Sequence, residues 1–177
     1  MEGKLLACAL LGVTMLAALP AAAQETAQAP EQEALRQRQA ARMADGFAQL
    51  HGFGEGVAAA LAASSPAKRS RRVEGFNGKL TLKTYRQPGI ELTTESGGGN
   101  TFPGSLAISR AGYPLPLGLH IGDRRGAVED VLGAPATGGD TLVLKRTEGE
   151  GCADPIILTF RDKVLTRVDW TWESCQD

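Results

Sequence analysis

The second half of the chain repeats the pattern of its first half. Two strand-like tetrapeptides recur: Leu-Thr-Leu-Lys at 80–83 as Leu-Val-Leu-Lys at 142–145, and Ile-Glu-Leu-Thr at 90–93 as Ile-Ile-Leu-Thr at 156–159. Ahead of each set lies a helix-forming stretch that ends at Pro66 or Pro135. Because the loops differ in length, this is a loose duplication and not a short-period repeat. It predicts an α+β fold of two units, each a helix followed by a three-stranded antiparallel sheet.

The first residues form a targeting segment. A positive charge at Lys4 precedes an apolar run over 5–19, and alanines at 21–23 supply the small residues of a cleavage site before Gln24. The run is too short for a permanent span, which needs about 20 apolar residues; a retained anchor is the alternative. Cleavage ahead of Cys8 would leave almost no apolar stretch, so we expect no lipid anchor there. The sequence predicts an exported, periplasmic or secreted chain with no transmembrane span in its mature form.

Domain boundaries follow from this processing and from the duplication. We expect a signal peptide over 1–23, a mobile leader and helix start over 24–42, a first unit over 43–112 and a second over 113–177.

The first unit is expected to open with two helical segments. The first covers 34–50 and is made of good helix formers, and its inward face holds Met43, Phe47 and Leu50. Gly52 and Gly54 are expected to end it. The apolar face of the second, shorter helix consists of Val57, Ala60 and Leu61.

Alternation of apolar and polar residues predicts six strands with one buried and one wet face. They are expected at 80–85, 90–93, 106–109, 142–145, 155–160 and 165–172. In the first of them, Leu80 and Leu82 are expected on the buried face, and Lys83 and Tyr85 on the wet face. The glycine-rich stretch at 96–100 connects two strands, so we interpret it as a turn and not as a phosphate loop.

The last two strands predict a hairpin with a definite register. The expected pairs are Phe160 with Thr166, Leu158 with Val168, and Ile156 with Trp170, because a slip by one residue would place Leu158 opposite a charge. This register assigns Trp170 and Trp172 to the core; exposed binding anchors are the alternative.

Two cysteines remain after cleavage, Cys152 and Cys175. In an oxidising compartment an even pair predicts a disulfide, which would contribute about 3 kcal/mol across the open end of the last hairpin. A metal site is disfavoured because the two histidines, His51 and His120, lack ligand spacing. We therefore expect no metal and no cofactor.

The helix of the second unit carries the most specific local pattern. Asp123 is expected to cap it, Gly133 and Pro135 to end it, and its inward face to hold Val128, Val131 and Leu132.

The pattern begins with a glycine, a short capping segment and an inward valine, and it continues with Leu-Gly-Ala-Pro at 132–135. Three strands follow it, and the last of them contains tryptophan. This stretch resembles the SmpA/OmlA family of small outer-membrane assembly lipoproteins. The tandem arrangement of two such units looks like the architecture of β-lactamase inhibitory protein. The resemblance covers 122–177 and, more weakly, 51–110. It implies helices packed on an antiparallel sheet whose other face, or loops, bind a protein.

The charge of the chain gives no general case for nucleic-acid binding, because the formal net charge is −1 at pH 7. One local exception is a basic run formed by Lys68, Arg69, Arg71 and Arg72. We interpret it as a solvated loop between helix and strand. The alternative is an anion site for an acidic protein, anionic lipid headgroups or lipopolysaccharide phosphate.

No catalytic set is recognisable, since neither histidine stands in a known relation to a serine or an acid. We therefore expect a non-enzymatic binding or envelope-scaffold module that acts through surface complementarity on another envelope or secreted protein. An inhibitor of a secreted or periplasmic hydrolase is the alternative. The candidate binding residues are Lys68, Arg69, Arg71, Arg72, Lys83, Tyr85, Glu91, Arg167 and Asp169, together with the loop at 97–102.

Overall fold

The computed structural model describes residues 21–75, 78–136, 138–145 and 154–172. The expected cleavage site therefore lies only partly within the described residues, and both Cys152 and Cys175 lie outside them. The chain divides into two compact units, 1–35 and 36–177. The described part of the first unit is helical throughout, and the second contains all of the strands.

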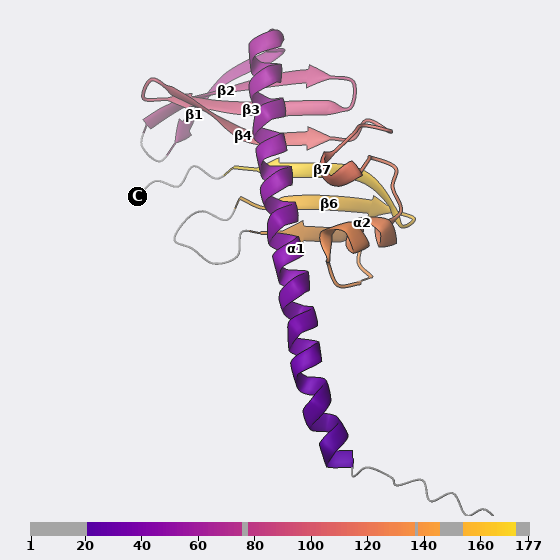
Figure 1. The fold of residues 1–177 in the computed structure, drawn as a ribbon. Helices are drawn as coiled ribbons and strands as arrows, with labels where there is room; N and C mark the ends of the chain where they lie inside the picture. Colours follow the sequence, from indigo (N-terminus) through magenta and orange to yellow (C-terminus); the bar gives the residue numbers. More distant parts are fainter. Residues whose placement is uncertain (1–20, 76–77, 137, 146–153, 173–177) are drawn as a thin grey trace, which may run out of the picture. The chain divides into compact units, whose positions relative to one another are not determined.

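A single helix, α1 (Ala21–Ser64), takes the place of the two expected helical segments (Figure 1). The prediction that Gly52 and Gly54 end a helix is wrong. A Cβ atom at Gly54 would lie 2.7 Å from the Trp170 ring, so this glycine lets helix and sheet approach closely. Gly46 has the same role against Leu132, where the corresponding distance is 2.7 Å. These glycines mark contacts with the rest of the fold and not the ends of a helix.

The inward face of α1 agrees with the sequence in part. Phe47, Leu50 and Leu61 are buried, and Met43 and Val57 pack against them half-buried. Ala60, however, is exposed, and Ala58 is buried in its place.

Seven strands form one antiparallel sheet in the order β1-β2-β3-β4-β7-β6-β5, so the protein is α+β (Figure 1). The strands are β1 (Arg69–Gly75), β2 (Gly78–Gln87), β3 (Ile90–Gly97), β4 (Asn100–Ile108), β5 (Thr141–Leu144), β6 (Ile156–Arg161) and β7 (Val164–Thr171). All six expected strands are present. The seventh, β1, occupies the segment interpreted as a solvated loop, so that interpretation is wrong and the first half has four strands before the connector.

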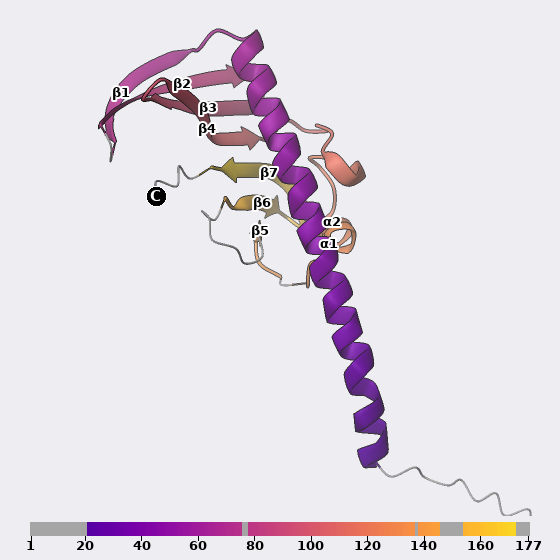
Figure 2. The ribbon, with the colours of Figure 1, turned by 60° about the vertical axis from the view of Figure 1, so that its left-hand side comes forward.

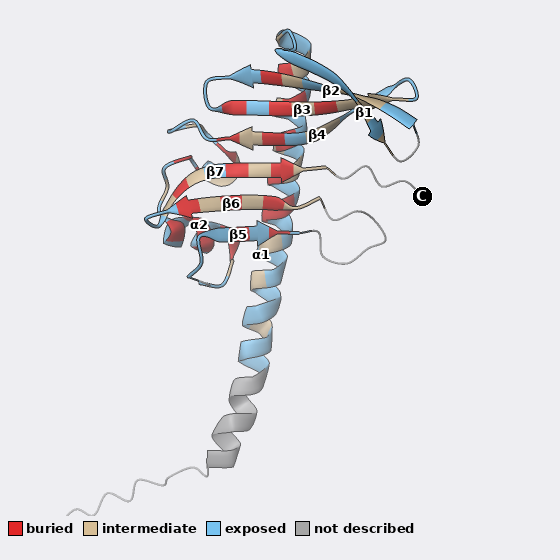
Figure 3. Cartoon of the chain, turned by 180° about the vertical axis from the view of Figure 1, so that it is seen from behind, coloured by how far each residue is buried: buried red, intermediate tan, exposed pale blue. Residues whose placement is uncertain are grey.

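Residues 36–64 of α1 and the short helix α2 (Arg125–Leu132) lie on the same side of the sheet. Figure 3 views the sheet from the other side, where no described helix lies in front of the strands. The core is the layer between helices and sheet, and its largest fully buried side chain is Trp170 on β7, next to the central strand β4. The indole N–H of Trp170 donates to the carbonyl oxygen of Leu50 in α1 at 2.9 Å.

The assignment of faces in β2 is opposite to the expected one. Residues 88 and 89 form a two-residue turn that pairs Gln87 with Ile90, and Tyr85 consequently pairs with Leu92 on the helix-covered face. Tyr85 is buried and Lys83 shares its face, whereas Leu80 and Leu82 are half-buried on the opposite face. The large aromatic residue occupies the core, and the leucines do not.

The register of the last hairpin is confirmed for two of its three expected pairs, Leu158 with Val168 and Ile156 with Trp170. The third pair is wrong, because Phe160 pairs with Leu165 after an irregularity between Thr159 and Phe160. The shift allows Leu165 to be fully buried next to Phe160. Trp170 is buried as expected, and Trp172 is half-buried against the core.

Helix α2 departs from the expected pattern at its start. Its N-cap is Arg124, without a side-chain cap, and the carboxylate of Asp123 instead accepts from the backbone N–H of His120 at 2.7 Å. Val128 and Leu132 are buried as expected, but Val131 is 40% exposed. The expected end is confirmed, with Gly133 in the left-handed conformation at φ 67°.

Replacing Gly133 with alanine is expected to lower the free energy of unfolding by about 1–2 kcal/mol, since a left-handed non-glycine residue is strained. The new Cβ would also lie 2.9 Å from the Cβ of Arg42 in α1. Urea unfolding of the two proteins measures the difference. Gly126→Ala is the control, because its Cβ meets nothing within 4 Å; equal losses in both variants would contradict the strain at Gly133.

Candidate binding surface

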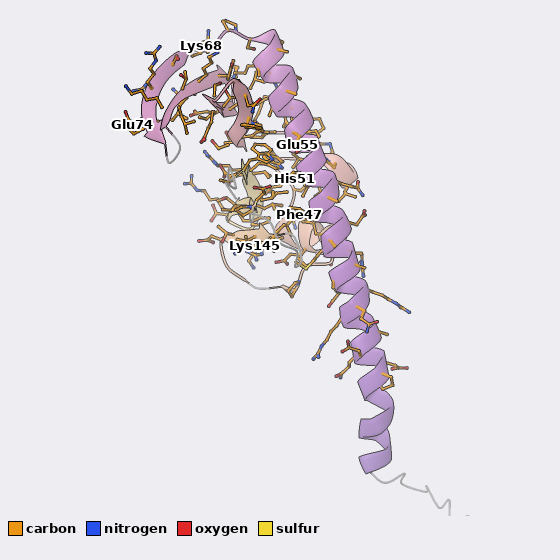
Figure 4. All side chains as sticks on the ribbon, turned by 90° about the vertical axis from the view of Figure 1, so that its left-hand side faces the viewer. Phe47, His51, Glu55, Lys68, Glu74 and Lys145 are labelled. Atoms are coloured by element: carbon orange, nitrogen blue, oxygen red, sulfur yellow. The ribbon has the colours of Figure 1, made fainter. Side chains whose placement is uncertain are left out.

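The β1–β2 hairpin concentrates positive charge at one edge of the sheet. The segment from 68 to 83 contains six basic residues and one acidic residue, Glu74, so its formal charge is +5 in a chain of net charge −1. The basic residues are Lys68, Arg69, Arg71, Arg72, Lys79 and Lys83. Figure 2 shows the strong curvature of the hairpin, and Figure 4 labels Lys68 and Glu74 at the two ends of β1.

These cations are exposed and unneutralised. Lys68, Arg69, Arg71 and Arg72 are all exposed, and none of them makes an ion pair with any carboxylate in the described part of the chain. The pairing with β2 distributes them over both faces of the sheet. Arg69 and Arg71 lie opposite Thr84 and Leu82 on the uncovered face, and Arg72 lies opposite Thr81 on the other. The hairpin therefore presents positive charge on both sides of its free edge.

Sequence reasoning found these residues but not the strand that holds them. Val73 is the only large apolar residue in β1, so no alternation is visible there. The available signal was the Asn-Gly dipeptide at 77–78, because such a pair generally marks a turn and here lies between Val73 and Leu80.

The uncovered face of the sheet carries the remaining charged candidates, and these are neutralised locally. Glu91 in β3 accepts from Arg86 in β2, with Nε and Oε2 2.9 Å apart. Arg167 and Asp169 pair within β7 at 2.6 Å. The hydrogen bond to Asp169 raises the pKa of Arg167 above its usual value, although burial opposes this shift. These pairs resemble an ordinary solvated sheet face.

The nine candidate residues therefore do not form one polar face. Glu91, Arg167 and Asp169 share the uncovered face, whereas Lys83 and Tyr85 lie on the covered one. Tyr85 is buried and is not available as a contact residue. The remaining four, Lys68, Arg69, Arg71 and Arg72, gather at β1.

A hollow of about 380 Å³ lies beside α1 and is lined by His51, Glu55 and Lys145, among others. Figure 4 labels these three side chains. His51 lies between two carboxylates: its Nδ1 is 3.8 Å from Glu55 Oε1, and its Nε2 is 3.6 Å from Asp154 Oδ2. These distances are too long for direct hydrogen bonds. Among the described residues, no group of three His, Cys, Asp or Glu side chains is placed to hold a metal ion.

A second hollow adjoins α2, where Arg125 and Glu129 form an almost fully buried ion pair with Nε and Oε1 2.6 Å apart. The guanidinium carbon of Arg125 also lies 4.9 Å from the centre of the Phe160 ring. Both charges therefore have partners within the protein, and this cluster is structural.

Most of the expected loop at 97–102 is strand, because β3 ends at Gly97 and β4 begins at Asn100. Phe102 in β4 is exposed and lines a groove between α1 and strands β3 and β4. Ala58, Ala62 and Thr94 line this groove, which measures about 260 Å³. The Thr94 hydroxyl is buried and has no hydrogen-bond partner within the described ranges.

Within the part of the chain that the structure describes, no helix is long and apolar enough to cross a membrane. Comparison of the chain with protein-family models, with curated proteins and with solved structures gives no match.

Proposed function

We propose that this chain is an exported binding module that joins a partner of the cell envelope or a secreted protein through the basic β1–β2 hairpin. The observation that carries the proposal is the +5 charge of this hairpin, whose arginines on β1 are exposed and lack ion pairs among the described carboxylates. Folded proteins usually intersperse charges of both signs on their surfaces, so an unneutralised cluster favours an acidic partner. The proposed activity is binding by complementarity, without catalysis.

Export and the disulfide complete the proposal. The apolar run over 5–19 with alanines at 21–23 supports cleavage before Gln24. In the oxidising compartment that an exported chain enters, Cys152 and Cys175 would form a disulfide. The confirmed pairs Ile156–Trp170 and Leu158–Val168 support this, because the two cysteines lie beyond the open end of the same hairpin.

We also propose that the sheet is a duplication of one unit, as the resemblance to SmpA/OmlA proteins and to β-lactamase inhibitory protein implies. The strand order supports it, because β2-β3-β4 and β5-β6-β7 are two meanders that meet antiparallel at β4 and β7. The equivalent strands β3 and β6 both start at the recurring tetrapeptide, at Ile90 and Ile156. In this arrangement β1 is an addition to the first copy, which makes its basic edge specific to one half.

Reversing the charge of the hairpin is expected to abolish capture of the partner. Arg71→Glu combined with Arg72→Glu changes the local charge from +5 to +1 and leaves the buried core untouched. The full-length protein is expressed with a C-terminal tag and purified from envelope extracts at two salt concentrations, with the N-terminus and co-purifying proteins determined by mass spectrometry. Capture should be lost in the variant and should weaken with salt in the unaltered protein.

Arg36→Glu combined with Arg38→Glu is the matched control, since both side chains are exposed on α1 and the change in net charge is equal. Equal capture by all three proteins would refute a role for the hairpin. If the captured protein is a hydrolase and this chain inhibits it stoichiometrically, the chain is an inhibitor and not a scaffold. Binding to vesicles containing anionic lipid, with no protein captured, would contradict a protein partner.

A further inference from the structure

We infer that β1 takes up an extended, acidic segment of the partner as an additional strand of the sheet. This inference rests on the proposed binding function and specifies its geometry. β1 is the first strand of the order, and no described residue pairs with its outer side. An edge strand of this kind offers a row of free backbone N–H and C=O groups, which an extended peptide can use.

The edge is regular enough to act as a template. All seven residues of β1 pair with β2 in a continuous register, from Arg69–Thr84 to Gly75–Gly78, without a bulge. A bulge would bend the edge and interrupt the spacing of its free groups. An added strand would therefore find an unbroken hydrogen-bonding row.

Protection against aggregation explains this edge less well. The opposite edge is β5, which has only four residues, and short edges are themselves a protective device. β1 has seven residues, and its charged side chains are three arginines and Glu74. Protection requires charge of either sign, whereas recognition of an acidic chain requires an excess of one sign at defined positions.

The arginines are placed to contact such a strand on both faces. Side chains of an added strand would alternate between the same two faces as those of β1, at cross-strand Cβ distances of about 5 Å. Arg69 and Arg71 would meet acidic residues on one face, and Arg72 would meet one on the other. A peptide that places acidic residues at alternate positions satisfies the first pair of arginines.

Charge also decides between occupants. A second copy of β1 would bring one hairpin of charge +5 against another, which disfavours pairing between copies of this chain. A membrane surface would meet the cations of one face only, whereas the arginines of β1 project from both. An extended acidic segment can pair with the arginines on both faces of β1 and with its free backbone N–H and C=O groups at the same time.

The test uses the full mature protein and a synthetic capped peptide of alternating Glu and Thr, matched to the seven residues of β1. Two further peptides of the same sequence carry N-methyl groups on alternate amides, one on the odd and the other on the even positions. In an added strand only every second residue directs its N–H and C=O toward the neighbour. One N-methylated peptide should therefore lose at least about tenfold in affinity while the other retains it. Amide exchange of β1 should slow when the unmodified peptide binds.

Binding through charge alone would affect both N-methylated peptides equally and leave amide exchange in β1 unchanged. That result would overturn strand addition while leaving the proposed function intact, provided that Arg71→Glu with Arg72→Glu still weakens binding. If the peptide binds this variant as well as it binds the Arg36→Glu, Arg38→Glu control, both strand addition and the role of the hairpin fail. Absence of peptide binding to the unaltered protein at low salt would also overturn strand addition, whereas the capture experiment judges the proposed function separately.

Discussion

Replacing Trp170 with alanine is expected to lower the free energy of unfolding by about 4 kcal/mol, the range typical of truncating a buried tryptophan. Trp170 is 1% exposed and pairs with Leu106 on one side and Ile156 on the other, so it links the two halves of the sheet. Its indole lies against Gly54 and donates to the Leu50 carbonyl. The substitution therefore opens a cavity where α1 meets the centre of the sheet.

Urea unfolding followed by circular dichroism measures this loss. Trp170→Phe separates packing from hydrogen bonding, since it retains most of the apolar volume and removes the N–H donor; a loss of about 1–2 kcal/mol is expected. Phe102→Ala is the exposed aromatic control, expected to change stability by less than about 0.5 kcal/mol because Phe102 is 54% exposed. A Trp170→Ala loss as small as that of Phe102→Ala would contradict the central position of the indole.

The sequence was sufficient to locate the strands that have one buried face. In β6 and β7, branched and aromatic residues at every second position predicted both strands and the pairing of Leu158 with Val168. That prediction failed only beyond Thr159, where an irregularity shifts the register. The pattern of apolar residues does not reveal this irregularity, because Phe160 faces the core whether or not the register shifts.

Two other features could not be obtained from periodicity. β1 has no buried face, so backbone pairing with β2 supports it and its side chains give no alternation. Gly54 stands where a helix would ordinarily be weakened by about 1 kcal/mol relative to alanine. Its purpose is visible only when Trp170, distant in the chain, is placed next to it.

The sequence predicted which residues belong to the candidate site, but not how they are arranged on the surface. The basic residues were recognised from their density in the chain, but the distribution of Arg71 and Arg72 over opposite faces depends on the strand. Tyr85 was assigned to the wet face because Leu80 and Leu82 were taken as inward. The two-residue turn at 88–89, which fixes the pairing of Gln87 with Ile90, is the local feature that determines the correct phase.

The basic edge lies apart from the core in the strand order, so variants in one should leave the other intact. Arg71 and Arg72 are exposed on an edge strand, where exchange of a charge changes stability little. Trp170 is remote from the free edge in the strand order, since β2, β3 and β4 lie between β1 and β7. Loss of binding at constant stability is therefore the signature expected of the hairpin.

Replacing Glu129 with alanine is expected to lower the free energy of unfolding by about 3 kcal/mol, because it removes the carboxylate that bonds the buried Arg125 guanidinium at 2.6 Å. The Arg125 and Glu129 side chains are only 9% and 10% exposed, and Nε and Oε1 are 2.6 Å apart. Contact of the guanidinium with the Phe160 ring persists in the variant but does not replace the carboxylate. Urea unfolding at neutral pH measures the change.

The double variant Arg125→Leu with Glu129→Leu distinguishes the ion pair from simple loss of packing. Apolar side chains can replace a buried pair at little cost, so the double variant is expected to be more stable than Glu129→Ala alone. The exposed pair of Arg86 and Glu91 provides the reference, and Glu91→Ala should cost less than about 1 kcal/mol. If Glu129→Ala costs no more than Glu91→Ala, the α2 ion pair does not contribute as a buried pair, and the apolar packing of Val128 and Leu132 holds this helix on the sheet.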